Sequence, residues 1–194
     1  AFTLTVTTTA TESASGSTTA VSTTIDVVVD AVADQPMLTA AATNGIEGAT
    51  IPLDISAALT DLDGSETLSA VTIAGIPAGA SLSAGTDNGD GTWTVEINQL
   101  SNLALTPAPG QVEPMTLNVS VTSTEAANGS AATSTVVLNI GIEAVADAPV
   151  VTINDATGLE DSPIALDIAA ALGGPNSTET LASVTIAGVP QGAV

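Results

Sequence analysis

The sequence repeats itself at a spacing of 113 residues. Residues 1–81 align with residues 114–194 without a gap, and 35 of these 81 pairs are identical by direct count. The string "VTIAG", for example, stands at 71–75 and again at 184–188. Self-similarity at a fixed period is typical of tandem arrays of equivalent modules. We therefore divide the chain into the C-terminal strands of a preceding repeat (1–30), a complete repeat (31–143) and the N-terminal strands of a following repeat (144–194).

Most segments of the repeat alternate apolar and polar residues with a period of two. "MTLNVSV" at 115–121 carries its apolar residues at odd positions, and "TWTVEI" at 92–97 alternates Trp93, Val95 and Ile97 with polar residues. This pattern is typical of strands with one buried and one solvated face. Only "ISAAL" at 55–59 hints at a helical turn. The strands are expected at 37–42, 50–55, 69–76, 81–84, 92–97, 103–106, 115–124 and 131–142.

Turn residues separate the predicted strands. Asn128-Gly129 lies between two alternating segments, and "DNGDG" at 87–91 precedes another, as tight hairpins require. "GIPAG" at 75–79 and "TPAPG" at 106–110 mark further reversals. Short strands at this spacing in a repeat of about 113 residues predict an all-β fold, with immunoglobulin-like or cadherin-like β-sandwich repeats arranged head to tail.

The charge of the chain restricts its partners. It has no Lys, Arg or His, and its formal net charge is −21. Such a chain repels nucleic acid and anionic membranes. No apolar run reaches the ~18 residues that a membrane span needs, so we expect no membrane insertion. Without Cys or Lys, neither a disulfide nor a Lys–Asn isopeptide bond can crosslink the fold. A metal ion is the remaining way to hold small domains together.

The residue types of common catalytic sites are missing. There is no His, Cys, Lys, Arg or Tyr, and the many Ser and Thr residues lie in alternating strands, where a solvated face explains them. The best carboxylate pair for acid–base chemistry, Asp61 and Asp63, does not recur, because Gly174 and Asn176 occupy the matching positions. We therefore expect no enzyme. A carbohydrate-binding module is an alternative, but its only candidate platform, Trp93, alternates with apolar residues and is expected in the core.

Acidic residues gather at the predicted boundary between the first two repeats. The linker "DAVADQP" at 30–36 is followed by "DLDGSE" at 61–66. Strand 37–42 leaves this boundary and strand 50–55 returns to it, so the loop lies at the same end as the linker. Calcium binds six to eight oxygens, mostly from carboxylates and carbonyls, and would relieve the repulsion among these acids. The predicted Ca²⁺ ligands at this boundary are Asp30, Asp34, Asp61, Asp63 and Glu66.

Acidic residues also mark the second boundary. The linker "EAVADAP" at 143–149 repeats the first one, with Glu143 and Asp147. Glu47 lies on the loop between strands 37–42 and 50–55, at the opposite end of the repeat, and is expected to face this second linker. The simpler interpretation of any single Asp is a turn residue, since its side chain accepts hydrogen bonds from nearby backbone N–H groups. That interpretation suits Asp87 and Asp90 in "DNGDG".

Several motifs together suggest a family. The linker acids ahead of a proline occur with "GIEG" at 45–48, "GLEDSP" at 158–163, "DLDGSETLS" at 61–69 and "GTDNGDGTW" at 85–93. In this order they resemble the repeats of giant bacterial adhesins exported by type I secretion, which are described as Ig-like, cadherin-like or VCBS-type repeats. The resemblance covers the whole chain. It implies an extracellular stalk segment of a cell-surface or biofilm-matrix adhesin, whose junctions between adjacent repeats are stiffened by calcium.

By position, the resemblance assigns further ligands to the second junction. Its candidates are Glu47, Glu143, Asp147, Glu160 and Asp161. The third repeat departs from the pattern, because "GGPNS" replaces "DLDGS" and removes two ligands. The second junction is therefore expected to bind calcium weakly, differently from the first, or not at all, and it is a candidate hinge. A fibre subunit, completed by neighbouring copies of the chain, is the alternative to a stalk segment.

Overall fold

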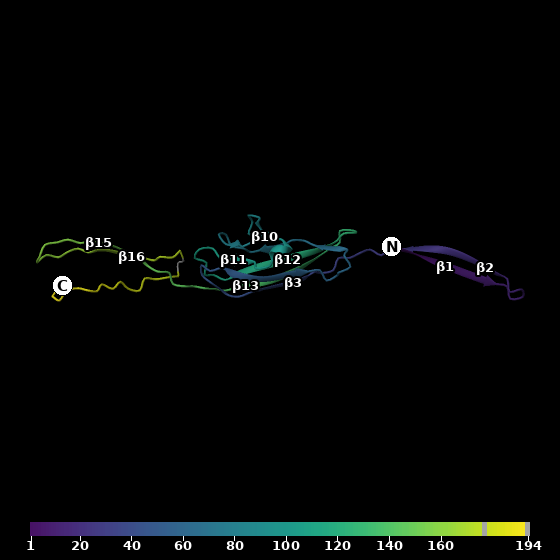
Figure 1. The fold of residues 1–194 in the computed structure, drawn as a ribbon, viewed down its shortest axis with the longest axis horizontal. Helices are drawn as coiled ribbons and strands as arrows, with labels where there is room; N and C mark the ends of the chain where they lie inside the picture. The colour runs from purple at the N-terminus through teal and green to yellow at the C-terminus, as the bar shows by residue number, and fades with distance from the viewer. Residues whose placement is uncertain (176–177, 193–194) are drawn as a thin grey trace. The chain divides into compact units, whose positions relative to one another are not determined.

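The computed structural model describes residues 1–175 and 178–192, and these residues form an all-β chain (Figure 1). One 3-10 turn, η1, is the only helical element in the described part. The elements are β1 (Phe2–Thr11), β2 (Thr18–Val27), β3 (Met37–Ala42), β4 (Gly45–Ile46), β5 (Ile51–Ala58), β6 (Glu66–Leu68), β7 (Val71–Ala74), β8 (Ser81–Leu82), β9 (Thr86–Asp87), β10 (Thr92–Val95), η1 (Ile97–Gln99), β11 (Ala104–Thr106), β12 (Met115–Glu125), β13 (Ala131–Ile140), β14 (Ile142–Glu143), β15 (Val150–Asn154) and β16 (Asp167–Ala171).

The predicted strands are present, with two kinds of difference. Each of the eight predicted segments between residues 37 and 142 contains a strand, whereas the short strands β4, β6, β9 and β14 were not predicted. The predicted helical turn at 55–59 is wrong, because these residues complete and follow strand β5. Strand β5 lies between β3 and β11 in its sheet, and pairing with these neighbours overrides the helical propensity of the alanines.

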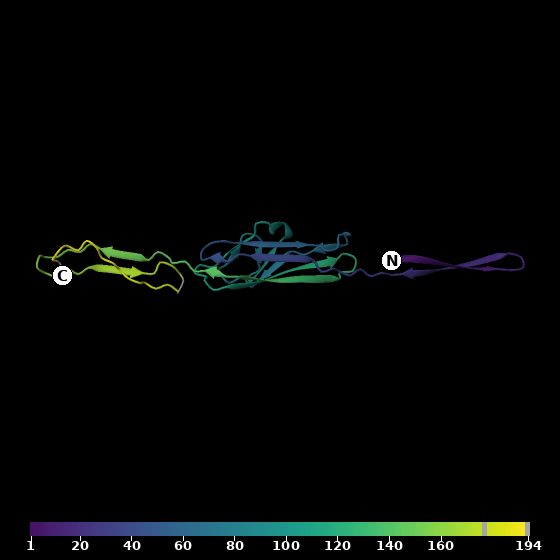
Figure 2. The ribbon, with the colours of Figure 1, turned by 90° about the horizontal axis from the view of Figure 1, so that it is seen from below.

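The chain divides into two compact units. Unit 1 consists of Ala1–Met37, Ala58–Ser69 and Thr122–Ser134, and unit 2 contains the remainder of the described chain. The sheets of unit 2 have the strand orders β13-β12-β7-β10-β9 and β3-β5-β11-β8, and their strands lie in two layers in Figure 2. The multiple antiparallel sheets of this all-β fold are consistent with a β-sandwich.

The core of unit 2 follows the predicted alternation. Leu117 and Val119 of β12 are fully buried, as are Val71 and Ile73 of β7. Val95 of β10 is also buried, but Trp93 is only half-buried. The expected core position of Trp93 is therefore wrong. Its strand lies beside the two-residue strand β9 at the end of the sheet, where little covers the ring.

Unit 1 contains the hairpin β1–β2 and the pairing of β6 with the C-terminal end of β12. The hairpin pairs Phe2 with Val27 and Leu4 with Ile25, so its apolar residues share one face. This face is exposed: Phe2 is 53% and Leu4 is 48% accessible. In β6–β12 the register sets Glu66 directly opposite Glu125. No helix among the described residues is long and apolar enough to cross a membrane.

Candidate functional site

The first linker, residues 30–36, is held by side chains from two other segments of unit 1. The backbone N–H of Asp34 donates to Glu66 Oε1 at 2.6 Å, and Ser123 Oγ donates to the carbonyl of Asp34 at 2.5 Å. The amide of Asn128 donates to the carbonyl of Ala31 at 2.6 Å. The linker is therefore fixed to strand β6 and to the β12–β13 hairpin through its backbone.

Glu66 and Glu125 form a buried carboxylate pair at this place. Directly opposite residues of an antiparallel pair project to the same side of the sheet, and the two side chains are only 6% and 5% exposed. Each uses one oxygen: Glu66 Oε1 accepts from Asp34 and Glu125 Oε1 accepts from Ser65 Oγ at 2.7 Å. The Oε2 atoms of both are buried without a hydrogen-bond partner in the described part of the chain.

Two buried carboxylates without a compensating charge are costly. The chain has no Lys, Arg or His, and burying a single ion costs several kcal/mol unless it is paired. Buried polar atoms in proteins are nearly always satisfied by protein, water or an ion. The two Oε2 atoms are therefore the best candidates in unit 1 for holding a cation.

The acidic loop at 61–65 is organised by its own carboxylates. Asp61 Oδ1 accepts the N–H of Asp63 at 2.9 Å, and Asp63 Oδ1 accepts the N–H of Ser65 at 2.7 Å. Hydrogen bonding by the Ser65 hydroxyl, and then by its N–H, lowers the pKa of Asp63. In the structure the Ser65 hydroxyl donates its single proton to Glu125 Oε1, so the Ser65 N–H is the group that donates to Asp63, and we assign the lowered pKa of Asp63 mainly to that backbone bond.

The five acids predicted at the first boundary do not converge. Within residues 1–175 and 178–192, no three acidic side chains lie close enough to hold a metal ion together. Asp30 and Asp34 are exposed, and Asp34 reaches the pair through its backbone. Asp61 and Asp63 contact their own turn. Glu66 alone of the five enters the buried pair.

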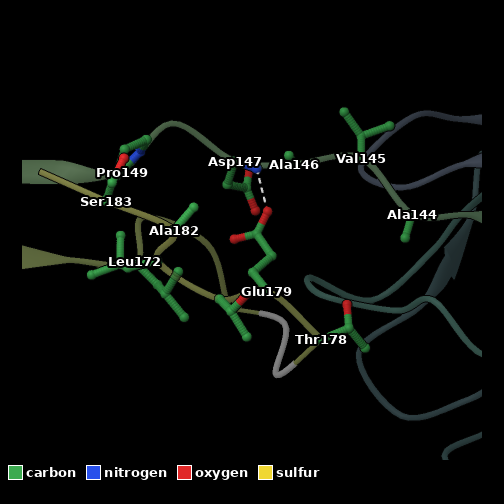
Figure 3. Close-up of a pocket in the computed structure, with 12 residues that line it drawn as sticks. Ala144, Val145, Ala146, Asp147, Pro149, Leu172, Thr178, Glu179, Ala182 and Ser183 are labelled. Carbon is green, nitrogen blue, oxygen red and sulfur yellow. Dashed lines mark hydrogen bonds between the residues drawn. The ribbon is translucent and has the colours of Figure 1, made fainter.

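The second linker, residues 143–149, is held by an equivalent hydrogen bond within unit 2. The N–H of Asp147 donates to Glu179 Oε1 (Figure 3), and Glu179 Oε2 is buried with no hydrogen-bond partner among the described residues. A cavity of about 490 Å³ lies beside this contact. Its lining includes Val145, Asp147, Pro149, Leu172, Glu179 and Leu181.

The two linkers differ in what packs against them. At the first linker Thr60 Oγ1 donates to the carbonyl of Gln35 at 2.7 Å. At the second, Gly173 and Gly174 stand where Thr60 and Asp61 stand in the first repeat. A Cβ atom added to Gly174 would overlap the Asp147 carboxylate, so the missing side chain makes room for that carboxylate. Asn176, the counterpart of Asp63, lies outside the described residues.

The other acids predicted at the second junction fall into two groups. Glu47 lies where it was expected, because its N–H donates to the carbonyl of Glu143 at 2.9 Å and its Oε2 accepts the N–H of Val145 at 3.3 Å. Glu160 and Asp161 do not belong here. They lie in the loop between β15 and β16, five residue pairs or roughly 17 Å along the hairpin from the second linker.

Local geometry recurs at the spacing of the sequence repeat. The bond from Asp34 to Glu66 matches that from Asp147 to Glu179, 113 residues later by subtraction. The turn bonds from Glu12 to Ser17 and from Glu125 to Ser130 also correspond, at 2.7 and 2.8 Å.

Glu125 was not predicted, although two signals in the sequence could have identified it. It continues the odd-numbered, inward parity of β12, whose buried face runs from Met115 through Leu117 to Ser123 and Glu125. It also recurs as Glu12 in the preceding repeat, as Glu66 recurs as Glu179.

Trp93 is half-buried and lines a hollow of about 320 Å³ together with Ile76, Pro77, Gly89 and Gly91. The neighbouring turn is built by Asp87 and Asp90, whose Oδ1 atoms accept the N–H groups of Gly89 and Thr92 at 2.8 and 3.0 Å. This agrees with the interpretation of "DNGDG" as a hairpin turn.

Comparison with known proteins does not identify a family for this chain. No family model and no curated protein sequence matches the chain. Two structures of an endo-fucoidan hydrolase of glycoside hydrolase family 107 are similar at 12% identity with a TM-score of 0.32 and at 10% identity with a TM-score of 0.29. They align with 89% and 81% of this chain but only 30% and 28% of their own, so the chain spans less than a third of their length. Similarity at this level indicates no function.

Proposed function

We propose that this chain is a structural extender, a stalk segment of tandem β-sandwich repeats in a secreted bacterial surface adhesin or matrix fibre. The observation that carries the proposal is the recurrence of one linker closure. Asp34 donates its N–H to Glu66, and the equivalent Asp147 donates to Glu179. A chain that ties each linker to the following module through the same bond sets the path between modules, as an extender requires.

Calcium stiffens the junctions in this proposal. The chain has no Lys, Arg or His side chain to balance its net charge of −21. Each linker bond ends on a glutamate whose second oxygen is buried and has no hydrogen-bond partner within residues 1–175 and 178–192. Extracellular calcium modules have dissociation constants of about 10⁻⁴–10⁻³ M. The exposed carboxylates of Asp30, Asp34, Asp61 and Asp63 add negative potential around the first junction.

The proposal includes an extracellular location and, because the common catalytic residue types are missing, no enzymatic activity. Each repeat contacts the adjacent repeats of the same polypeptide. The function is mechanical, because the repeats hold a distant binding region away from the cell surface. No step of this function needs a reaction.

The test is the distance across each junction with and without calcium. Because the chain has no Cys, cysteine pairs can be introduced for fluorescent labelling at the exposed positions Ser15 and Ser101 for the first junction, and at Ser101 and Ser162 for the second. Calcium at about ten times its dissociation constant is expected to narrow the distance distribution across the first junction, and chelator to broaden it. Identical distributions in the two conditions contradict the stiffening.

A fibre subunit is the second candidate function, and one observation favours it. The apolar faces of two hairpins are exposed, with Phe2 at 53% and Ile153 at 70% accessibility. Neighbouring copies would cover such faces by packing a sheet on them. The mass of the chain in solution distinguishes a fibre subunit from a stalk segment.

A further inference from the structure

We infer that Glu66 and Glu125 form a divalent-cation site within the body of the repeat, and that this site, rather than Asp61 and Asp63, is the one maintained from repeat to repeat. The inference deepens the proposed function, on which it rests for calcium as the available cation.

The strand register places two buried carboxylates on the same side of the sheet. Glu66 and Glu125 are directly opposite in the β6–β12 register, so their side chains leave the same side of the sheet. Both Oε1 atoms are occupied by hydrogen bonds, from the Asp34 N–H and the Ser65 hydroxyl. The two Oε2 atoms are buried and have no hydrogen-bond partner in the part of the chain that the structure describes. One cation bound by both atoms would satisfy them, and calcium accepts irregular arrangements of oxygen ligands.

The electrostatics favour a cation over an empty pair. Each side chain is at least 94% buried, since the two exposures are 6% and 5%. Two like charges on directly opposite residues in a poorly solvated place repel, and no side chain of the protein can compensate them. A divalent ion replaces this repulsion with two attractions.

Recurrence within the chain separates this pair from the other acids. Glu66 matches Glu179, and Glu125 matches Glu12. Asp61 instead matches Gly174, and Asp63 matches Asn176. Both glutamates of the pair therefore recur at the 113-residue spacing, whereas neither aspartate does. Glu179 also retains the buried, unpartnered Oε2.

An ion at this place would connect three segments. Glu66 holds the linker through Asp34, and Glu125 holds the acidic loop through Ser65. The loop is tied to the hairpin a second time, because the Ala126 N–H donates to the carbonyl of Ser65 at 2.9 Å. Binding at the pair therefore stabilises the repeat itself as well as the start of its linker.

The first experiment measures thermal unfolding of the whole chain by circular dichroism, in calcium chloride and in chelator. Calcium at about ten times its dissociation constant is expected to raise the Tm by about 5 °C. In Glu125→Gln, which keeps the shape and an acceptor for Ser65, the rise is expected to fall below about 1 °C. The Tm of this variant in chelator is expected to equal or exceed that of the unmodified chain, because one buried charge is gone.

Glu12→Gln is the matched control. Glu12 holds the equivalent position in the hairpin β1–β2, where it is exposed and accepts the N–H of Ala14 at 3.2 Å. Its substitution is expected to leave the full calcium response. A calcium response of unchanged size in Glu125→Gln overturns the site, and so does the absence of any response in the unmodified chain.

A second measurement uses the unmodified chain, in case a substituted one does not fold. Infrared spectra of protein labelled with ¹³C on glutamate carboxylates separate the Glu bands from the Asp bands. Calcium addition is expected to shift part of the Glu band. A shift confined to the Asp band would assign the ion to the exposed aspartates and overturn the site.

Combined with the junction distances, the results separate the two proposals. If Glu125→Gln abolishes the Tm response and calcium leaves the distances unchanged, the site stands and the stiffening fails. If Glu125→Gln keeps calcium-dependent stiffening, the extender function stands and the Glu66–Glu125 site is wrong.

Discussion

Asp90 illustrates how a single carboxylate in this chain is stabilised without a cation. Its Oδ1 accepts the Thr92 hydroxyl at 2.6 Å and the Thr92 N–H at 3.0 Å. These bonds, the hydroxyl first, lower the pKa of Asp90 below its ordinary value of 3.8. A folded-state pKa below the unfolded value contributes stability above the unfolded pKa, and that contribution is lost as pH falls below about 3.8.

Thr92→Ala tests this explanation. Removal of the hydroxyl leaves only the backbone donor, so the titration midpoint of Asp90, followed by NMR of the side-chain carboxyl carbon, is expected to move up toward 3.8. Thr94→Ala is the control, because Thr94 Oγ1 accepts from Asn88 rather than bonding to Asp90. A midpoint for Asp90 that stays as low in Thr92→Ala as in the unmodified chain contradicts the assignment.

Asp61 and Asp63 show the limit of spacing as a predictor at the residue scale. Their order in "DLDGSE" suits a calcium loop, and it equally suits two successive turns in which each Oδ1 accepts the N–H two residues on. The structure forms the turns. The sequence cannot separate the two possibilities, because both use a short acidic side chain followed by glycine.

At the element scale, strand β12 shows what the sequence could and could not predict. Its alternation placed Met115, Leu117, Val119 and Val121 inside, and all four are buried. The same parity carries Ser123 and Glu125 inward. The apolar alternation predicts the strand and its core face. It gives no signal at the polar end of the strand, where Ser123 contacts the linker. The pairing of β6 with this end depends on tertiary register, which local pattern does not contain.

Gly174 is expected to be needed for closure of the second linker. A Cβ atom there would overlap the Asp147 carboxylate, so Gly174→Ala is expected to displace Asp147 and weaken its N–H bond to Glu179. Loss of one such bond corresponds to about a five- to tenfold drop in protection of the Asp147 amide. Hydrogen exchange followed by NMR measures this drop.

The equivalent position in the first repeat provides the control. Asp61 already has a Cβ, so Asp61→Ala removes only its turn carboxylate and is expected to leave protection of the Asp34 amide unchanged. Equal protection of Asp147 in Gly174→Ala and in the unmodified chain would show that the glycine is not required.

At the scale of the whole molecule, composition and periodicity were sufficient for the fold class. An aliphatic chain with one Trp and one Phe, alternating with a period of two and punctuated by Gly and Pro, has few alternatives to packed antiparallel sheets. Periodicity also assigned the faces of β1 correctly, but only burial tells whether a face is covered. Leu4 and its counterpart Leu117 occupy matching positions, yet Leu4 is 48% exposed and Leu117 is 0% exposed.

The exposed hairpin faces and the net charge oppose each other in solution. Apolar residues such as Phe2, Leu4 and Val6 favour association, whereas 21 uncompensated negative charges oppose it. The Debye length falls from about 10 Å at 0.1 M salt to about 3 Å at 1 M. In chelator, the weight-average mass from sedimentation is therefore expected to equal 18.7 kDa at low salt and to increase at about 1 M sodium chloride.

Leu4→Thr assigns this association to the hairpin face, because it keeps a strand-forming residue while removing apolar area. Its mass at high salt is expected to stay near the monomer value. Leu62→Thr is the control: Leu62 is 85% exposed but lies in the acidic loop, away from any sheet face, so the association should persist. If the unmodified chain stays monomeric at high salt, its exposed sheet faces do not drive self-association, and the fibre-subunit function loses the one observation that favours it over the stalk segment.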